Sequence, residues 1–467
     1  MENVIKCLLV HQGDMENYGF MYVAGELKRI GCDIKWIDAN QIEFPIEIAI
    51  EYFPDYILFS PTTLFFNESL KLLKLLKERI PKVKSIFGGH HVLVSPKSVE
   101  ENKDIDFVIR GHVYGGVLES IFNSTAPKIQ IGRPGTNEEL NPARDEFYKD
   151  IPVLAKYPVH YVMSFFGCPY NCSYCSLSFL RDFYGKKEFN RLFMKRRPPR
   201  DVVNESKIFL KYPPKEVFMI DDDGLHGKDV EPWLEEFGPM WKKEIGLPIL
   251  TYVTPRSVVN ASDGALKLMS KYFLSVVMGI QSLDPETLEL FNRKAHNEKT
   301  IRLAVERLKK FDIPVRCDVI FGAPIGDPVE RGIETIKKLQ SFAIHCSFGG
   351  YGLMVFPETE LERELNKKGI GFDNAYTIRS TSGETTVQFS EQTKQKLRKL
   401  AKFLQFFVTY KIDEYYMKAL LHLDINNDEI LYDLSVANFH LAQRIRYGEK
   451  EGDKIAKEKL KTQPFFL

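Results

Sequence analysis

The chain has 467 residues, with 64 basic and 63 acidic side chains and a formal net charge of +1. This length exceeds what one hydrophobic core supports and indicates two domains with an appendage, and the balanced charge gives no general attraction to nucleic acid or anionic lipid. Seven cysteines, no secretory signal and no apolar run of about 20 residues argue for the reducing cytoplasm and against a membrane span.

The first 125 residues alternate short apolar runs with helical stretches. This alternation predicts a doubly wound, Rossmann-like α/β domain over residues 1–125, and such a domain binds ligands at the carboxyl edge of its sheet. The helices are expected at 18–30 and 67–79, and the strands at 5–10, 33–37, 56–60, 83–87 and 107–110.

Five short stretches of this domain stand out, at 18–24, 31–33, 60–63, 88–91 and 104–111. Together they resemble the cobalamin-binding domain that precedes the barrel in one large class of radical S-adenosylmethionine (SAM) enzymes. The resemblance implies cobalamin contacts at Ser60, Thr62, Gly88 and Gly89. The two glycines would let the backbone approach the flat corrin or its nucleotide tail closely.

The loop after the first strand departs from one known pattern. It reads His11-Gln12-Gly13-Asp14, without the aspartate-x-histidine-x-x-glycine spacing that places an imidazole on cobalt in domains of the methionine-synthase kind. A bound cobalamin is therefore expected to lack a histidine lower ligand, with His11, His90 and His91 as outside candidates. The same fold could instead serve as a platform for a substrate or a partner, because fold alone does not prove a ligand.

Residues 126–155 are rich in proline, asparagine and glycine. This composition favours turns over packed elements. We expect a linker here that carries the chain to a second domain.

An apolar run over 159–166 predicts a buried parallel strand and leads directly into Cys168, Cys172 and Cys175. Four-iron clusters normally take four thiolates, so three cysteines with no fourth nearby predict a cluster with one open iron. The alternatives are a zinc knuckle or unrelated thiols. Zinc sites usually use two cysteine pairs or a nearby histidine, and neither follows closely in the sequence.

The cysteine spacing of three and then two residues, with Tyr174 before the last cysteine, resembles the radical SAM superfamily. The resemblance implies a [4Fe–4S] cluster on the three cysteines and SAM chelated to the open iron by its amino and carboxylate groups. An external donor such as flavodoxin or ferredoxin would supply the electron that cleaves SAM to a 5′-deoxyadenosyl radical. The sequence singles out no catalytic acid or base.

Strands and helices alternate again after the cysteines, with amphipathic helices expected at 298–311 and 328–342. This rhythm predicts βα units around a parallel sheet. With the strand before the cysteines there are six strands, which matches the partial (β/α)6 TIM-type barrel of the superfamily, expected over 156–388 with its site at the carboxyl ends of the strands. The other five strands are expected at 216–220, 248–253, 274–280, 315–321 and 347–355.

Polar residues follow these strands where the family binds SAM. We expect Asp221, Asp222 and Asp223 to hold the amino group, although acidic triplets are often solvated turns. Arg256, which with Tyr252 follows the third strand, is a candidate partner of the SAM carboxylate.

The fourth and fifth strands carry the remaining candidates. Gln281 and Ser282 end a Gly-Ile-Gln-Ser pattern in which glutamine replaces the acid that often binds ribose. Backbone groups near Gly322 could contact adenine. Arg316 and Asp318 are either a cross-strand ion pair or ligands.

Residues 186–200, just after the cysteine loop, are locally basic with apolar residues interleaved. Such a segment is usually a solvated face, but it could clamp an anionic substrate or the cobalamin phosphate. On that reading, charge reversal at Arg196 and Arg197 raises the apparent Michaelis constant.

The carboxyl-terminal residues 389–467 lack strand alternation, and helices with apolar stripes are expected at 393–410 and 412–423. The stripe predicts packing against the barrel. A lid over the substrate is the alternative.

The two resemblances together imply a cobalamin-dependent radical SAM enzyme that methylates an unactivated carbon of a small-molecule or peptide substrate. One alternative keeps both cofactors and performs cyclisation or rearrangement without methyl transfer. The other, from a different class, is a non-catalytic iron–sulfur or cobalamin sensor.

Overall fold

The structure is a computed structural model that describes residues 4–40, 46–123, 126–136, 138–342, 346–373 and 383–423, together with 436–437, 440–441, 443–444 and 448–462. It divides into two compact units. Unit 1 comprises Met1–Val162 and Phe179–Lys215, and unit 2 comprises Met163–Ser178 and Glu216–Leu467.

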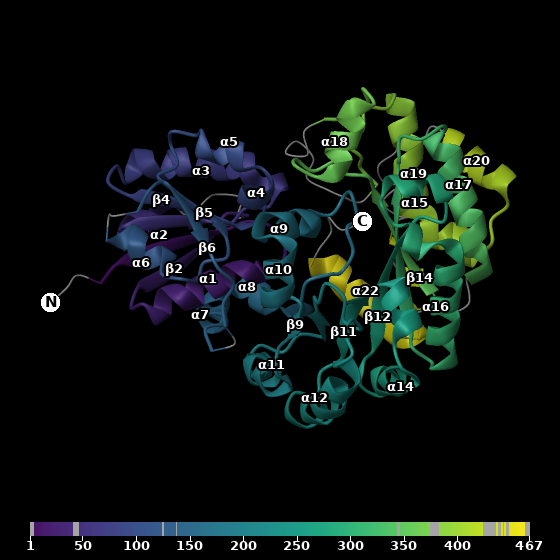
Figure 1. The fold of residues 1–467 in the computed structure, drawn as a ribbon, viewed down its shortest axis with the longest axis horizontal. Helices are drawn as coiled ribbons and strands as arrows, with labels where there is room; N and C mark the ends of the chain where they lie inside the picture. Colours follow the sequence, from purple (N-terminus) through teal and green to yellow (C-terminus); the bar gives the residue numbers. More distant parts are fainter. Residues whose placement is uncertain are drawn as a thin grey trace. The chain divides into compact units, whose positions relative to one another are not determined.

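Unit 1 is built on a six-stranded sheet in the order β2-β1-β3-β4-β5-β6 (Figure 1). All neighbouring strands are parallel. The order reverses between β1 and β3, so the predicted doubly wound fold is confirmed, and its switch point lies at that pair. The strands are β1 (Lys6–His11), β2 (Asp33–Asp38), β3 (Tyr56–Phe59), β4 (Lys84–Phe87), β5 (Phe107–Gly111) and β6 (Ile129–Gly132).

Helix α1 shows why this sequence folds locally as it does. The Asn17 side chain accepts a hydrogen bond from the Phe20 amide and caps the helix, and Lys28 and Arg29 complement the dipole at its end. The other helices of unit 1 are α2 (Ile46–Tyr52), α3 (Phe66–Arg79), α4 (Gly89–Val94), α5 (Pro96–Glu100), α6 (Val117–Phe122), α7 (Arg144–Asp150), α8 (Pro152–Ala155), α10 (Lys186–Leu192) and α11 (Pro199–Ser206), while α1 spans Tyr18–Arg29 and α9 (Ser176–Tyr184) crosses the unit boundary.

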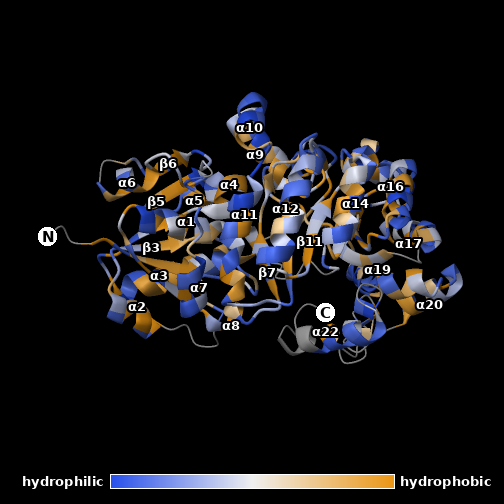
Figure 2. Ribbon diagram, turned by 90° about the horizontal axis from the view of Figure 1, so that it is seen from below, coloured by the Kyte–Doolittle hydropathy of each residue, from blue (hydrophilic) through white to orange (hydrophobic). Residues whose placement is uncertain are grey.

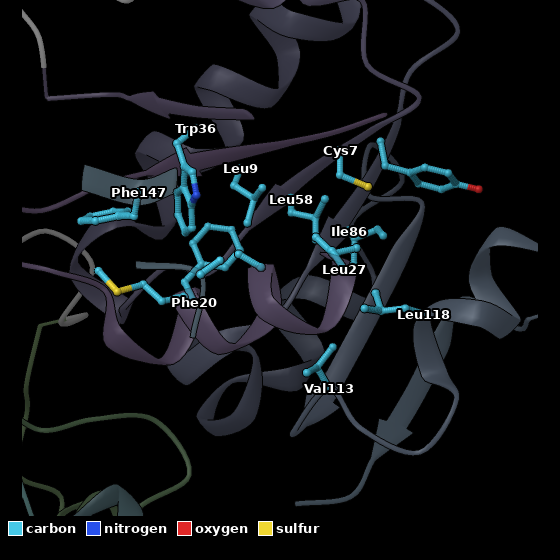
Figure 3. Close-up of a cluster of buried hydrophobic side chains, with 14 of the residues drawn as sticks. Cys7, Leu9, Phe20, Leu27, Trp36, Leu58, Ile86, Val113, Leu118 and Phe147 are labelled. Carbon is cyan, nitrogen blue, oxygen red and sulfur yellow. The ribbon is translucent and has the colours of Figure 1, made fainter. Parts of the chain in front are cut away.

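Unit 1 has two hydrophobic cores. Figure 3 shows the first, in which Phe20 and Leu27 of α1 lie with Trp36, Leu58 and other buried side chains. The second contains Phe59, Phe87 and Phe66 among its buried residues. Burial on both faces explains why the strands are nearly continuous hydrophobic runs, which Figure 2 shows in orange.

The expected linker contains more regular structure than its composition indicates. Residues 129–132 form β6, which pairs in parallel with β5 from Val108↔Ile129 onward, and α7 and α8 follow. The expectation of turns is wrong here because β5 supplies hydrogen-bonding partners that the local sequence does not reveal.

The strand expected before the cysteines is split into β7 (Val159–Val162) and β8 (Phe165–Phe166). Between these strands the backbone amides bond to a side chain and not to a neighbouring strand. The amides of Ser164 and Phe165 donate to the Asp221 carboxylate at 2.6 and 2.9 Å. A long-range carboxylate therefore interrupts an otherwise continuous apolar run.

Unit 2 carries the barrel. The second sheet has six strands, and five of them lie in unit 2 in the order β14-β13-β12-β11-β10, with parallel neighbours. The predicted partial barrel is confirmed. These strands are β10 (Glu216–Met219), β11 (Ile249–Val253), β12 (Ser275–Gln281), β13 (Val315–Phe321) and β14 (Cys346–Gly352), and the helices are α12 (Val230–Glu244), α13 (Pro255–Asn260), α14 (Asp263–Tyr272), α15 (Pro285–Leu290), α16 (Glu298–Lys310), α17 (Pro328–Leu339) and α18 (Glu360–Lys367).

Helices α19 (Glu391–Thr409), α20 (Glu414–His422) and α22 (Glu449–Thr462) follow the barrel. Helix α19 packs on β14 so closely that a Cβ at Gly350 would overlap the backbone of Ala401, and Leu404 is buried. The predicted packing of this stripe against the barrel is confirmed. Residues 424–435 and 463–467 of the predicted helical segment lie outside the described residues. No described helix combines the length and the apolar character needed to cross a membrane.

Candidate active site

The cysteine loop follows β8 and is held by backbone contacts. Gly167 has a φ of +97°, which turns the chain into the loop at little steric cost. Its amide donates to Asp222 Oδ2 at 2.7 Å. Ser173 anchors the other side, where its hydroxyl donates to the Leu290 carbonyl at 2.6 Å and its amide to the Phe291 carbonyl at 3.1 Å. The loop is thus fixed at both ends to neighbouring segments of unit 2.

The three cysteines provide a donor set that fits an iron–sulfur cluster. Burial raises the pKa of the Cys175 thiol to about 11 and that of Cys168 further, so both thiols need a cationic centre in order to ionise. Among the described residues, no three histidine, cysteine or acidic side chains are grouped as ligands of a single metal ion. Thiolates are the usual protein ligands of four-iron clusters.

Arg293 is a site residue that the sequence analysis missed. It is only 5% exposed, and its Nη1 lies 3.2 Å from Cys172 Sγ and 3.3 Å from the Tyr174 hydroxyl. Its Nη2 donates to the Gly279 carbonyl at 2.6 Å. A single arginine after α15 carries no local pattern, so only the fold reveals that it lies against the cysteine loop.

The three adjacent aspartates have different surroundings. Asp221 accepts from Ser164 and Phe165, and Asp223 accepts from the Thr254 hydroxyl at 2.9 Å. Asp222 is the member bonded to the cysteine loop. Burial raises the pKa of Asp222 to about 7, which places its ionisation near neutrality. Of the three, Asp222 is thus the one that is both partly exposed and bonded to the cysteine loop.

The structure places Tyr252 within β11, and Arg256 follows this strand. Tyr252 is 38% exposed, and its ring lies 4.6 Å from that of Phe218. Arg256 is exposed on α13. Burial, Arg293 and Arg256 lower the pKa of His296 to about 3. The positive charge of Arg256 therefore acts on His296, a neighbour of Arg293.

A cavity of about 250 Å³ lies at the ends of β12 to β14. Tyr174, Gln281 and Asp318 provide part of its wall, and Ile320, Leu353, Met354 and Phe356 provide its apolar part, with Tyr351 and Gly352 completing the lining. The structure therefore brings together residues from the cysteine loop and from three strand ends. Gln281 reaches the wall with a φ of +64° at an irregularity between Gly279 and Gln281 in the β12 register.

Three other predicted residues are placed around this cavity region. Arg316 Nε donates to Asp318 Oδ1 at 2.9 Å, so the expected ion pair exists, but the two residues lie on one strand, β13, and not across strands. Ser282 is buried and accepts from the Asp284 amide at 3.0 Å. Gly322 has a φ of +90° and lies beside Leu397 and Thr385.

The predicted cobalamin contacts lie at the carboxyl ends of β3 and β4 in unit 1. Gly89 has a φ of +83°, and a Cβ there would overlap Ser60 Oγ, so the backbone is packed where no side chain fits. The Gly88 amide donates to the Phe59 carbonyl at 2.9 Å, and the exposed Thr62 precedes a 3₁₀ turn. This edge borders the switch point, where doubly wound folds bind ligands.

The histidines near this edge are engaged by the protein. His91 Nδ1 and Nε2 lie 3.3 Å from Thr63 Oγ1 and 3.0 Å from Ser98 Oγ, and burial lowers the pKa of His91 to about 3. His11 Nε2 lies 3.0 Å from the Gly13 carbonyl. His90 is exposed at the start of α4. The absence of a histidine lower ligand stays a prediction.

The basic segment after the cysteines is not a uniformly solvated face. Arg197 is 6% exposed, and its Nη1 lies 2.8 Å from Glu205 Oε2 and 3.2 Å from the Tyr22 hydroxyl. The two expectations for this segment, a solvated face and a clamp for an anion, are therefore both wrong for Arg197. Its charge is paired with Glu205 in a buried ion pair. The local sequence could not reveal this, since Tyr22 is far from it in the chain.

Comparison with known proteins identifies two matching family models. The B12 binding domain matches residues 7–116 and the radical SAM superfamily matches residues 162–330. An uncharacterized methyltransferase of Pyrococcus horikoshii is 25% identical, over 69% of this chain and 73% of its own. The hopanoid C-3 methylase of Methylococcus capsulatus is also 25% identical, over 66% of this chain and 61% of its own, so the chain spans less than two thirds of that relative.

A solved structure shares the fold of the whole chain. The radical SAM methyltransferase TsrM from Kitasatospora setae, with cobalamin and a [4Fe–4S] cluster bound, has a TM-score of 0.67 at 12% identity and covers 98% of this chain and 100% of its own. The cysteine trio, the doubly wound sheet and the two family matches agree. The chain belongs to the radical SAM enzymes that carry a B12-binding domain, and its cofactors are a [4Fe–4S] cluster, SAM and cobalamin.

Proposed function

We propose that this protein is a cobalamin-dependent radical SAM methyltransferase that methylates an unactivated carbon of a small-molecule or peptide substrate. The observation that carries the proposal is the presence in one chain of the B12-binding match at 7–116 and the cysteine trio within the radical SAM match at 162–330. When bound, the cluster and SAM supply the radical chemistry and cobalamin supplies the methyl group.

The residues of unit 2 bind and orient. Cys168, Cys172 and Cys175 hold the cluster, Asp222 accepts hydrogen bonds from the SAM ammonium, and Arg256 meets the carboxylate. Asp221 and Asp223 lie beside Asp222 and keep its segment in place through their hydrogen bonds. These roles follow from the donor and acceptor chemistry of each group.

The residues of the cavity wall and of the neighbouring strand ends bind the adenosine part of SAM. Tyr174 and Gln281 line the cavity, and Ser282, Gly322 and Tyr252 lie at neighbouring strand ends. The apolar part of the wall keeps water from a reactive carbon radical. In unit 1, Ser60, Thr62, Gly88 and Gly89 form the edge that receives cobalamin.

The wider arrangement is proposed with this function. Residues 1–125 are the cobalamin domain, 126–155 a connector, 156–388 the barrel and 389–467 a helical domain. The cytoplasm is the compartment, and a flavodoxin or ferredoxin is the electron donor.

Anaerobic reconstitution tests the proposal. Protein loaded with iron, sulfide and hydroxocobalamin should show the absorbance of bound cobalamin and should form 5′-deoxyadenosine from SAM with dithionite as reductant. Cys172→Ala should abolish this product, whereas Cys317→Ala, a buried cysteine on β13, should not. A protein that binds both cofactors and forms no 5′-deoxyadenosine above background would instead be a sensor. Once a substrate is found, a product heavier by one methylene unit distinguishes methylation from cyclisation.

A further inference from the structure

Arg293 brings a buried cation against one cysteine of the trio. Its guanidinium contacts Cys172 Sγ at 3.2 Å, the Tyr174 hydroxyl at 3.3 Å and the Gly279 carbonyl at 2.6 Å. The three partners come from two segments, the cysteine loop and the end of β12. The geometry therefore fixes the guanidinium on the sulfur side of the loop.

The charge on Arg293 persists despite burial. A guanidinium is not deprotonated in proteins, so Arg293 keeps its charge although only 5% of it is exposed. The neighbouring His296 has its pKa lowered to about 3 by burial and by the Arg293 and Arg256 charges, so it is neutral near pH 7. A permanent positive charge thus lies within hydrogen-bond reach of a sulfur that ligates the cluster.

We propose that Arg293 is a positioning residue that raises the reduction potential of the [4Fe–4S] cluster through its N–H bond to Cys172 and its buried charge. Hydrogen bonds to ligand sulfurs and nearby charge are the levers by which a protein tunes such clusters. One electron from an external low-potential donor adds to the cluster and increases its negative charge, which Arg293 stabilises. No bond to Arg293 forms or breaks, and no proton moves. The inference rests on the cluster of the proposed function.

The full-length protein, reconstituted anaerobically without SAM, provides the test. Its midpoint potential is measured by a redox titration followed by electron paramagnetic resonance, together with iron and sulfide content. Arg293→Gln removes the charge and keeps the three cysteines. We expect the reduced-to-oxidised ratio at a fixed potential to fall by at least about tenfold, which equals about 59 mV for one electron. Leaving SAM out of the titration means that SAM binding cannot produce this shift.

Arg331→Gln is the matched control, because it makes the same change of charge. Arg331 pairs with Asp284 at 2.7 Å at the start of α15 and with Glu286 at 2.8 Å, so two carboxylates and not a cysteine receive its hydrogen bonds. Its midpoint should equal that of the wild type. A shift of the same size in Arg331→Gln would overturn the specific role of Arg293.

The outcomes separate the inference from the proposed function. Equal midpoints in wild type and a fully loaded Arg293→Gln would overturn the inference alone, whereas a wild type that takes up no iron would overturn both. If Arg293→Gln does not retain iron, Arg293→Lys carries the test. Lysine keeps the charge but cannot maintain all three contacts of the guanidinium fork, so its midpoint should also lie below that of the wild type, and an equal value would overturn the inference.

Discussion

Glu205 on α11 lies at the centre of a buried charge network in unit 1. Its carboxylate pairs with Arg144 at 2.9 Å and with Arg197 at 2.8 Å. The hydroxyls of Tyr18 and Tyr22 also donate to it, at 2.9 and 3.0 Å. Two guanidinium groups and two hydroxyls thus depend on one acid.

Glu205→Gln should destabilise unit 1 by about 3–5 kcal/mol, the usual cost of removing one partner of a buried ion pair. The substitution keeps the shape and leaves two buried cations with too little negative charge. Arg144 retains Glu16 at 3.5 Å, which places the expected loss within that range and not above it. Burial opposes ionisation of Glu205, but the two arginines hold its pKa below the ordinary value. The stabilisation is therefore present above the unfolded pKa and is lost as the pH falls through the folded one.

Urea unfolding followed by the fluorescence of Trp36 measures this loss. Trp36 belongs to unit 1, and the other two tryptophans, Trp233 and Trp241, belong to unit 2. Their replacement by phenylalanine makes the signal report unit 1. Glu188→Gln is the control, since its pair with Arg191 is exposed, and should leave the midpoint unchanged. A Glu205→Gln protein within about 1 kcal/mol of its parent would refute the reasoning, because such a value is typical of surface pairs.

Three further predictions concern cofactor binding and pH. Gly89→Ala should weaken cobalamin retention by at least about tenfold, or 1.4 kcal/mol, because the added Cβ overlaps Ser60. Gly31→Ala is the control: it has a similar positive φ with open space around it and should bind cobalamin normally. Equal losses of cobalamin on dialysis from both variants would contradict this prediction. His91→Gln should leave the absorbance of bound cobalamin unchanged, because both ring nitrogens are engaged, and an altered cobalt spectrum would count against it. Without SAM, the free energy of unfolding of unit 2 should decline as the pH rises from about 4 to 7. In this range the folded state keeps the proton of Asp222, whose pKa is raised, while the unfolded chain releases it. Urea unfolding followed by tryptophan fluorescence should show a smaller dependence of stability on pH for Asp222→Asn.

The sequence predicts the sheets well because their signal is local. The expected strand 315–321 coincides with β13, since buried parallel strands read as apolar runs whatever their neighbours. Strand β6 and the ion pair of Arg197 were not predictable in this way. Strand β6 depends on its pairing with β5, and the burial of the Arg197–Glu205 pair involves Tyr22, which is far away in the chain.

The candidate site also contains residues that local sequence predicts and residues that only long-range contacts reveal. The cysteine spacing and the glycine pair at Gly88 and Gly89 are local motifs, and both predict a cofactor without the fold. Arg293 has no motif, because its partners, Cys172 and the Gly279 carbonyl, meet it only when the cysteine loop reaches β12. Local sequence thus indicates which cofactors bind, whereas long-range contacts determine the electrostatic environment around them.

The acidic triplet shows how this distinction can be tested at adjacent residues. Asp221 and Asp223 are fully buried, whereas Asp222 is partly exposed, so alternate residues after β10 meet different surroundings. Asp221 accepts hydrogen bonds from the amides of Ser164 and Phe165, whereas Asp222 accepts one from Gly167 in the cysteine loop.

Asp221→Asn should therefore destabilise unit 2 by about 1.5–3 kcal/mol, the usual worth of hydrogen bonds to a charged group, as measured by urea unfolding. Asp222→Asn should not destabilise unit 2 near neutral pH, because the neutral amide avoids the burial cost that raises the pKa of Asp222. It should weaken SAM binding to the reconstituted protein by about tenfold, because a charge-assisted bond to the ammonium is lost. Titration calorimetry with SAM measures the second effect. If Asp222→Asn bound SAM as tightly as the wild type while Asp221→Asn folded normally and lost SAM, the roles assigned to these two neighbours would have to be exchanged.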